Sequence, residues 1–219
     1  MRYAIVNGNK TEPAPKLLGY CQACESQMVP KCGQHVLWHW AHKSRKHCDK
    51  WWESETEWHR TWKSIFPVEW QEVVQIDDTN HEKHIADVKT SKGLVIEFQH
   101  SPISLEEMES REKFYVNLVW VVDGCRNELD KNFFSLSLSK PSPEQPNEFP
   151  LRWWGSSKLF HNWAGTRRAV YFDFGGDLLW KLLHFDKKSK VGAVSPVDRQ
   201  RFIKLCVETV FSIDPKKYY

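Results

Sequence analysis

Apolar and polar positions in the middle of the chain predict a hairpin of two strands, followed by a helix and a third strand. Residues 85–89 and 94–99 have the composition of strands, and Ser91-Lys92-Gly93 between them is typical of a hairpin turn. Residues 104–115 begin with Ser-x-x-Glu, the pattern of a capping box, and are predicted to form a helix. Residues 117–124 are almost continuously apolar, as in a strand that is buried on both faces. A strand, a helix and a strand in this order predict a parallel crossover.

Upstream of the hairpin, three- and four-residue steps between apolar positions predict a helix over residues 51–65. Glu55, His59 and Lys63 then fall on one face of this helix, at positions i, i+4 and i+8. An exposed charged face with helix-supporting pairs explains this stripe as well as a functional site does. Residues 69–76 alternate loosely and are predicted to be the first strand of a sheet.

Two polar side chains inside the second strand of the hairpin indicate a cation site. Glu97 and Gln99 are two residues apart, so both point to the same face, and the hairpin partner can bring Asp87 to that face. Facing acids with an amide beside them suit a hard divalent cation such as Mg²⁺ or Mn²⁺, which activates water and holds a phosphate. The alternative is the wet face of an ordinary hairpin. That alternative is less expected because Glu97 lies in the apolar run Val95-Ile96-Glu97-Phe98.

Cysteine and histidine are dense near the N-terminus and predict a zinc site. Cys21-x2-Cys24 is followed before residue 50 by further histidines and cysteines, and zinc takes four nitrogen or sulfur ligands in a tetrahedron. If residues 36–40 form a strand, His39 and His42 lie on different faces unless the strand ends between them. A closed site of four such ligands is structural. Four of five residues are expected to bind, with the first four preferred and the last as competitor: Cys21, Cys24, His42, Cys48 and His39.

Asp87, Glu97 and Gln99 form the pattern D-x9-E-x-Q. This pattern resembles the core of the PD-(D/E)xK nucleases, with Gln99 where that fold more often has lysine. The resemblance implies Mg²⁺ or Mn²⁺ held by Asp87 and Glu97, with Gln99 orienting the water or the phosphate. In that fold the helix before the hairpin often adds a carboxylate. Glu55 is therefore implied as a further ligand, and His59 as a contact to water or phosphate.

Several longer runs are similar to the competence protein CoiA-like family. They are residues 97–104, the Cys-x-x-Cys with His39-Trp40-Ala41-His42 before Cys48, and the charged run of residues 53–63. The similarity covers roughly residues 20–124 and returns more weakly beyond them. It implies a nuclease or a nuclease-fold DNA-processing protein that acts in DNA uptake and recombination, or in defence. Because glutamine cannot stabilise charge as lysine does, the cation is expected from elsewhere, from Lys63 or Lys113.

The predicted fold class is α/β: a PD-(D/E)xK nuclease-like mixed sheet flanked by helices, with a small N-terminal zinc-binding module and a C-terminal α+β extension. The expected division is a zinc-finger-like module, the nuclease-like core, a Pro-rich linker or long loop, and the extension, at residues 1–50, 51–135, 136–150 and 151–219. Within the extension we expect a strand, then a strand or short helix, then a helix, at residues 169–174, 178–185 and 198–210.

Aromatic residues mix with cations at the start of this extension, in Arg152-Trp153-Trp154 and around Trp163. Stacking on bases together with phosphate contacts is one interpretation. Packing of tryptophan under long arginine side chains is the other, and it is slightly favoured.

Composition narrows the class of protein. With 219 residues, of which 41% are hydrophobic and 27% charged, a soluble globular protein is expected rather than a disordered chain. The net charge of +3 permits binding to DNA, the expected partner. The N-terminus lacks the pattern of a signal peptide, and no stretch has the length of a membrane span, so we expect a cytoplasmic protein with no membrane partner. In that compartment the six cysteines more often bind metal than form disulfides.

Two functions follow from these observations. The first is a metal-dependent endo- or exonuclease that hydrolyses phosphodiester bonds. The second is a zinc-stabilised nucleic-acid-binding or adaptor protein that keeps the fold without the chemistry, with recombination or defence proteins as its partners. The sequence leaves the form of the DNA open between single-stranded, duplex and branched.

Overall fold

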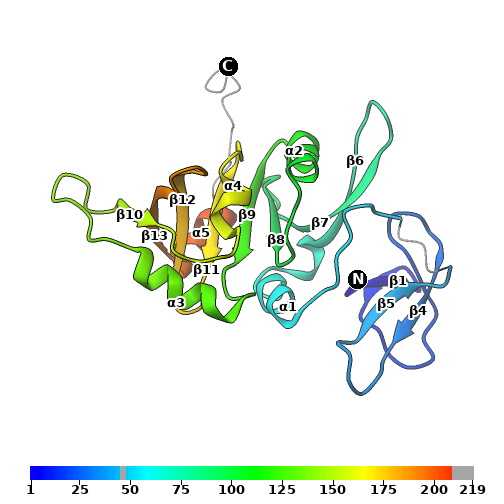
Figure 1. Ribbon diagram of the computed structural model, residues 1–219. Coiled ribbons are helices and arrows are strands. Elements are labelled where there is room, and N and C mark those ends of the chain that lie inside the picture. Colours follow the sequence, from blue (N-terminus) through cyan, green and yellow to red (C-terminus); the bar gives the residue numbers. More distant parts are fainter. Residues whose placement is uncertain (45–47, 209–219) are drawn as a thin grey trace. The chain divides into compact units, whose positions relative to one another are not determined.

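The computed structural model describes residues 1–44 and 48–208 (Figure 1). Contacts between Cα atoms divide the chain into two compact units, Met1–Lys89 and Thr90 onward. The division falls inside the expected nuclease-like core of residues 51–135, so that domain arrangement stays a prediction. Among the described residues, no helix is both long enough and apolar enough to cross a lipid bilayer.

The first unit begins with a five-stranded antiparallel sheet in the order β2-β1-β3-β4-β5. Asn7 and Gly8 join the first two strands with positive φ angles of 50° and 81°. Positive φ at both positions is the geometry of a two-residue hairpin turn whose twist matches that of the strands, and it favours Asn-Gly. The strands are β1 (Ala4–Val6), β2 (Asn9–Thr11), β3 (Gly19–Tyr20), β4 (Gln27–Lys31) and β5 (His39–His42).

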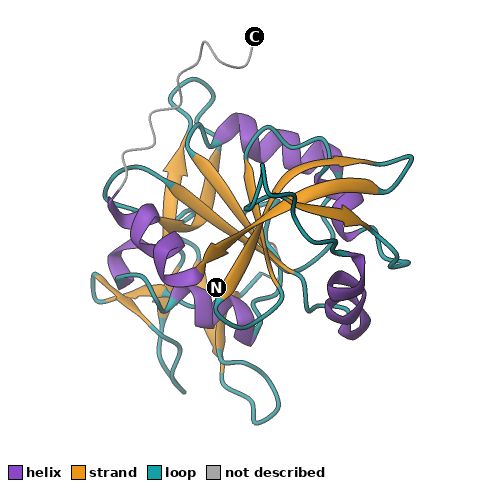
Figure 2. Ribbon diagram, turned by 90° about the vertical axis from the view of Figure 1, so that its left-hand side faces the viewer, coloured by secondary structure: helices purple, strands orange, loops and turns teal. Residues whose placement is uncertain are grey.

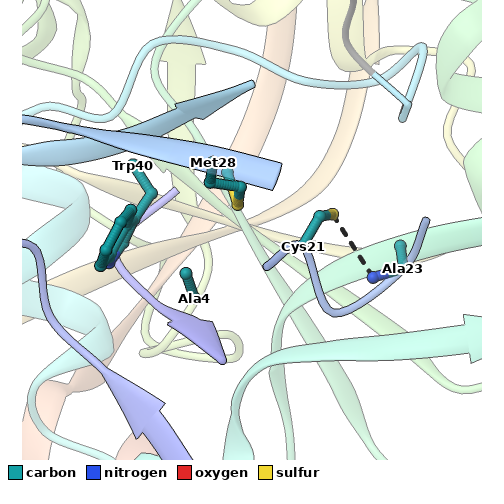
Figure 3. Close-up of a cluster of buried hydrophobic side chains, with 5 residues drawn as sticks. All are labelled: Ala4, Cys21, Ala23, Met28 and Trp40. Atoms are coloured by element: carbon teal, nitrogen blue, oxygen red, sulfur yellow. Dashed lines mark hydrogen bonds between the residues drawn. The ribbon is translucent and has the colours of Figure 1, made fainter. Parts of the chain in front are cut away.

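A small apolar cluster lies against this sheet (Figure 3). Its largest member is Trp40, which is 1% exposed and donates its indole N–H to the carbonyl of Thr11 at 2.9 Å. A Cβ atom on Gly19 would lie 2.9 Å from both Ala4 and Trp40, so only glycine fits there. So small a cluster is too little to stabilise a fold by burial alone. Its buried members are Ala4, Cys21, Ala23, Met28 and Trp40.

Helix α1 (Glu57–Lys63) is shorter than the predicted helix of residues 51–65, so the prediction is wrong at its start. Thr56 caps the helix because its hydroxyl accepts from the amide of His59 at 3.4 Å, while the His59 ring accepts from the amide of Thr56 at 3.2 Å. This capping box satisfies two amides that have no partner inside the helix. Glu55 therefore lies before the helix and not on its face.

The first unit ends with an antiparallel pair of strands. A 3-10 turn, η1 (Val68–Trp70), leads into β6 (Gln71–Ile76), and β7 (Lys83–Lys89) returns alongside it. Both strands were predicted, with starts that differ by two residues from the structure: β6 begins later than residue 69 and β7 earlier than residue 85.

The second unit is built on a mixed sheet with the order β10-β13-β12-β11-β9-β8. Strand β8 (Val95–Gln99), helix α2 (Leu105–Phe114) and β9 (Leu118–Asp123) form the predicted crossover, and β8 pairs parallel to β9. All six residues of β9 are buried, which confirms the prediction from its apolar run. Strand β11 (Ala169–Asp173) adds a third parallel strand beside β9.

The remaining strands of this sheet are antiparallel to their neighbours. They are β12 (Leu178–Asp186), β13 (Val191–Asp198) and the edge strand β10 (Phe149–Arg152). Helix α4 (Leu159–Trp163) contacts β12, and α5 (Arg199–Glu208) contacts β13; Figure 2 shows the helices beside the strands. The structure is thus a mixed α/β protein, as expected. The end of the helix predicted over residues 198–210 lies outside the described residues.

Helix α3 (Glu128–Ser137) and strand β10 occupy both ends of the stretch that we expected to be irregular. Phe134 on α3 is 3% exposed and stacks on Phe174, with ring centroids 3.9 Å apart. This aromatic contact spans forty residues of sequence, so no local pattern announces it. Between α3 and β10, residues 138–148 form neither a helix nor a strand. A β-bridge between Leu138 and Leu151 joins the two ends of this loop.

The aromatic residues of the extension divide between the two interpretations. Trp153 and Trp163 are both 3% exposed and belong to the core. Trp154 is 60% exposed, and the guanidinium of Arg152 lies 5.2 Å from the centre of its ring. Packing therefore accounts for two of the three tryptophans.

Candidate functional site

Four side chains of the first unit meet in a cysteine and histidine cluster. The chain turns tightly after β3, where the amide of Ala23 donates to Sγ of Cys21 at 3.4 Å. Strand β5 ends at His42, whose ring nitrogen lies 3.3 Å from Sγ of Cys24. Cys48 completes the set with its Sγ atom 3.6 Å from that of Cys21. The four ligand atoms all lie within 4.8 Å of one another.

These distances fit a tetrahedral zinc ion. Bonds of about 2.0–2.3 Å place the ligand atoms of such an ion roughly 3.3–3.8 Å apart. The thiol of Cys48 lowers the pKa of Cys21 to about 4 by hydrogen bonding to it, while the pKa of Cys48 is raised above its usual value for the same reason. Binding of zinc requires that both thiols lose their protons, because the thiolate is the ligand. The residues can therefore hold a structural zinc ion.

His39 stands apart from this cluster. Its Nδ1 atom hydrogen bonds the carbonyl of Leu37 at 2.8 Å. Because His39 and His42 are three residues apart in β5, they lie on opposite faces of the strand. His42 shares its face with buried Trp40, which directs it toward the cluster and His39 away from it.

Asp49 fastens the segment that carries Cys48 to strand β7. Its carboxylate bonds the ring of His84 at 2.8 Å and accepts from the amides of Ile85 and Trp51 at 2.8 and 2.9 Å. Burial alone would raise the pKa of Asp49, but these hydrogen bonds lower it below its usual value. The carboxylate thus remains charged and holds the Cys48 segment in place.

A second cluster in the first unit surrounds the ammonium of Lys63, at the end of α1. Lys63 is 3% exposed, and its Nζ atom lies 2.5 Å from Glu55, 3.1 Å from Glu72 and 3.8 Å from Asp87. Burial alone would lower the pKa of Lys63, but the three carboxylates raise it above its usual value. The ammonium is therefore a permanent positive charge in contact with three acids.

Glu55 reaches this cluster although it precedes the helix. One oxygen pairs with Lys63, and the other accepts from Nε of Arg60 at 3.0 Å. The oxygen that faces Lys63 is buried without a hydrogen bond of good geometry. The ion pair with Lys63 therefore offsets the cost of burying this oxygen.

Glu72 is a member of the cluster that we did not predict. It has a φ angle of 47°, which is rare for a residue other than glycine. The neighbouring pairs Gln71–Val88 and Val73–Ala86 place it opposite Asp87. Its oxygens accept from the amides of Arg2 and Tyr3 at 2.8 and 2.9 Å. No local signal marks this role, because all its partners come from other segments.

The carboxylate of Glu72 is charged. Burial alone would raise the pKa of Glu72, but the nearby Lys63 ammonium, followed by the chain terminus and the two amides, lowers it to about 2. The buried acid thereby ties the N-terminal strand to α1 and β6.

His59 caps helix α1 in this structure. It is 2% exposed, and its Nε2 atom lies 2.7 Å from Glu53 while Nδ1 faces Thr56. Burial alone would lower the pKa of His59, but the hydrogen bond to Glu53 and the charge of Asp87 raise it above its usual value. Its contact with water or phosphate stays a prediction.

In the second unit, Glu97 and Gln99 are both 4% exposed and share one face of β8. Glu97 pairs with Arg111 of α2 at 2.9 Å, and the guanidinium lies 5.8 Å from the ring centre of Trp120. Gln99 donates to the carbonyl of Ser101 at 2.9 Å. Arg111 was not predicted as a partner of Glu97.

The predicted ligands for Mg²⁺ or Mn²⁺ lie in both units. Asp87 and Glu55 belong to the first and Glu97 to the second, so a shared cation stays a prediction. The donor set fits such an ion chemically, because all three side chains are carboxylates, and Mg²⁺ and Mn²⁺ prefer oxygen ligands. Lys113, the other candidate cation, is an exposed residue of α2.

Comparison with known proteins gives one match. Residues 19–50 match a family model described as the competence protein CoiA, N-terminal domain. The matched segment contains all four members of the cysteine and histidine cluster. No curated protein and no solved structure matches the chain significantly.

Proposed function

We propose that this chain is a competence-related DNA-processing protein and a metal-dependent nuclease. The match of residues 19–50 to the CoiA N-terminal domain model supports the first part of this proposal. The reaction is hydrolysis of phosphodiester bonds in DNA. The zinc cluster is structural in this proposal, and the carboxylates of the central hairpin with the Lys63 cluster form the reaction centre.

The observation that carries the proposal is the ion pair between Lys63 and Asp87, at 3.8 Å. The nuclease pattern needs a lysine near its acids, and Gln99 stands where that lysine is more often found. Lys63 supplies a buried ammonium beside Asp87 from a different element, helix α1. The charge that Gln99 cannot provide is therefore present.

Each residue has a distinct task. Asp87, with 24% of its side chain exposed, is the member of the Lys63 cluster that reaches solvent, whereas Glu55 is 7% exposed. Asp87, Glu97 and Glu55 would hold Mg²⁺ or Mn²⁺, which when bound lowers the pKa of water and stabilises charge on the phosphate. Lys63 orients the carboxylates and adds positive charge. The Gln99 amide orients water or the phosphate.

A second function is favoured by the contact between Glu97 and Arg111. This buried ion pair neutralises the carboxylate that the nuclease needs as a ligand. A protein that keeps this pair closed would bind nucleic acid or partner proteins without cleaving DNA. The alternative is thus a zinc-stabilised adaptor in recombination or defence.

The test is cleavage of single-stranded, duplex and junction DNA with Mn²⁺ or Mg²⁺. Asp87→Asn keeps the shape of the side chain and removes its charge, and Asp78→Asn makes the same change at an exposed turn residue. We expect metal-dependent cleavage by the wild type and by Asp78→Asn, and a loss of at least about 100-fold in Asp87→Asn. Glu97→Gln should behave like Asp87→Asn, and Glu109→Gln on the exposed side of α2 like the wild type.

The opposite result selects the adaptor. If the wild type cuts no DNA in the panel, while it and Asp87→Asn bind DNA equally well, the nuclease proposal is wrong. Equal circular dichroism spectra of the variants exclude unfolding as the cause of lost activity.

A further inference from the structure

The second unit contains a cavity of about 780 Å³ at the carboxyl ends of the parallel strands β8 and β9. Parallel sheets commonly bind ligands at the carboxyl ends of their strands. The volume lies within the range of about 300–1,000 Å³ that is usual for small-molecule sites. Within the described part of the chain, the lining residues belong to the second unit. They come from the ends of the strands, the segment after β8, the start of α3, and α4 with the residues just before it.

A hydrogen-bonded histidine and aspartate line this cavity. Gln99 pairs with Val122, so the next residues of the two strands, His100 and Asp123, are neighbours. Nδ1 of His100 lies 2.8 Å from one oxygen of Asp123, and the other oxygen accepts from the amide of Cys125 at 2.8 Å. The carboxylate therefore holds the imidazole ring in a fixed orientation at the cavity.

The interior of the cavity combines apolar surface with polar groups. Ile103, Val122 and Trp163 are buried apolar residues of its walls. Asp130 is 5% exposed and hydrogen bonds the side chain of Ser157, which also lines the cavity. Apolar walls with a few hydrogen-bonding groups suit a nucleobase, which has apolar faces and a polar edge.

The rim of the cavity carries two exposed cations, Arg126 before α3 and Lys158 before α4. Exposed arginine and lysine are the usual contacts to nucleic-acid phosphates. Glu128 is an exposed acid of the same rim, which disfavours a doubly charged terminal phosphate. A phosphodiester, with one negative charge, is compatible with two cations and one acid.

We propose that this cavity binds one unpaired nucleotide of a DNA strand, with its base inside and its phosphodiesters at Arg126 and Lys158. The inference rests on the proposed function, in which DNA is the substrate, and it names the form of that DNA. A base inside a duplex has both faces stacked and its edge paired, so it cannot enter unless it leaves the helix. DNA with single-stranded nucleotides is therefore the substrate.

The test is binding of the full chain to a fluorescent single-stranded oligonucleotide and to the blunt duplex of the same sequence. Anisotropy is measured without added divalent metal, so no cleavage occurs, and without a chelator, so zinc stays bound. The variant Arg126→Gln/Lys158→Gln removes the cations of the rim. Its matched control, Lys187→Gln/Lys188→Gln, removes two exposed cations from the turn between β12 and β13.

We expect the rim variant to lose about tenfold in affinity for the single strand. Because each phosphate contact contributes about 0.7 to the salt slope for single strands, the slope of log K against log salt should fall by about 1.4. The control variant should keep the wild-type affinity and slope. The weaker binding to duplex should change little in either variant.

A second pair of variants tests the mouth of the cavity on helix α3. Leu129 lines the cavity and is 58% exposed, whereas Leu136 on the same helix is 73% exposed and does not line it. Both substitutions to glutamate are tolerated by the fold because both positions face solvent. Leu129→Glu should weaken single-strand binding about tenfold, and Leu136→Glu should change it less than twofold.

The inference is overturned if the wild type does not bind the single strand, if the rim and mouth variants bind it like the wild type, or if they weaken duplex binding equally. Its failure is distinct from that of the proposed function. If single-strand binding depends on the cavity but no metal-dependent cleavage occurs, only the nuclease proposal is wrong. If metal-dependent cleavage occurs but the rim and mouth variants bind the single strand like the wild type, only this inference is wrong.

Discussion

The first unit concentrates negative charge at two places and neutralises it in two different ways. At the cysteine and histidine cluster, the sulfur atoms of Cys21 and Cys48 lie 3.6 Å apart, and the four ligands are three cysteines and one histidine, without lysine or arginine. At the Lys63 cluster, the chain provides its own cation, in contact with three carboxylates. The cysteine and histidine cluster therefore depends on a metal ion from solution for its charge balance. The Lys63 cluster depends on such an ion only in part.

This contrast indicates that the cysteine and histidine cluster is structural and that the Lys63 cluster is suited to chemistry. A closed set of soft ligands binds zinc firmly and leaves no position for a substrate. An acidic set with a lysine inside it remains folded without a metal, so a hard cation can enter and leave. Removing the cation from each cluster in turn tests this comparison.

The largest effect is expected for the zinc cluster. Cys24 is exposed, so Cys24→Ser costs no core packing and removes one ligand; Cys32→Ser makes the same change outside the cluster. Binding of structural zinc contributes about 10 kcal/mol or more to folding of small zinc modules. We expect about one zinc per chain in the wild type and Cys32→Ser by mass spectrometry, and loss of zinc with a lower Tm in Cys24→Ser. Equal zinc content in both variants would contradict the assignment.

A smaller loss of stability is expected when Lys63 is replaced in its cluster. Lys63→Met keeps the length of the side chain but leaves the three carboxylates without their ammonium. Breaking a buried ion pair from one side costs about 3–5 kcal/mol. The free energy of unfolding in urea should fall by that amount, while Lys113→Met, on the exposed side of α2, should change it little. A loss below about 1 kcal/mol in Lys63→Met would show that this charge is solvated instead of buried.

The smallest effect is a pH dependence carried by Glu72. Its folded pKa of about 2 lies below the usual 4.5, so its contribution is present above pH 4.5 and is lost as the pH falls toward 2. Denaturant unfolding at several pH values should show a shallower loss below pH 4.5 in Glu72→Gln than in the wild type. Glu69→Gln, at an exposed position, is the control; if it flattened the profile equally, the assignment to Glu72 would be wrong.

Predictions from short sequence patterns succeeded where all the interacting groups are close in the chain. Ser104 caps α2 as its pattern indicated, because its hydroxyl accepts from the amide of Glu107 three residues later. The apolar run of β9 is buried throughout, and the strand pairs parallel to β8 after the predicted crossover. The cysteines of Cys-x-x-Cys meet because a tight turn joins them.

Two predictions failed for different reasons. Apolar spacing favoured a helix from residue 51, but the local cap formed by Thr56 and His59 starts it at Glu57. The predicted boundary between core and linker, after residue 135, falls inside helix α3, whose Phe134 stacks on Phe174 just after β11. The second error arises because local spacing contains no information on tertiary partners.

Local spacing and capping in the sequence specify the cysteine and histidine cluster, apart from the choice between His39 and His42, and the strand, helix and strand crossover. Only the tertiary structure decided which side chains neutralise the acids. Lys63 balances Asp87 and Glu72, whereas Arg111 balances Glu97, and each pair joins residues from separate elements. The physical reason is that a buried charge is stable only beside an opposite charge, and the fold rather than the neighbouring sequence selects that partner.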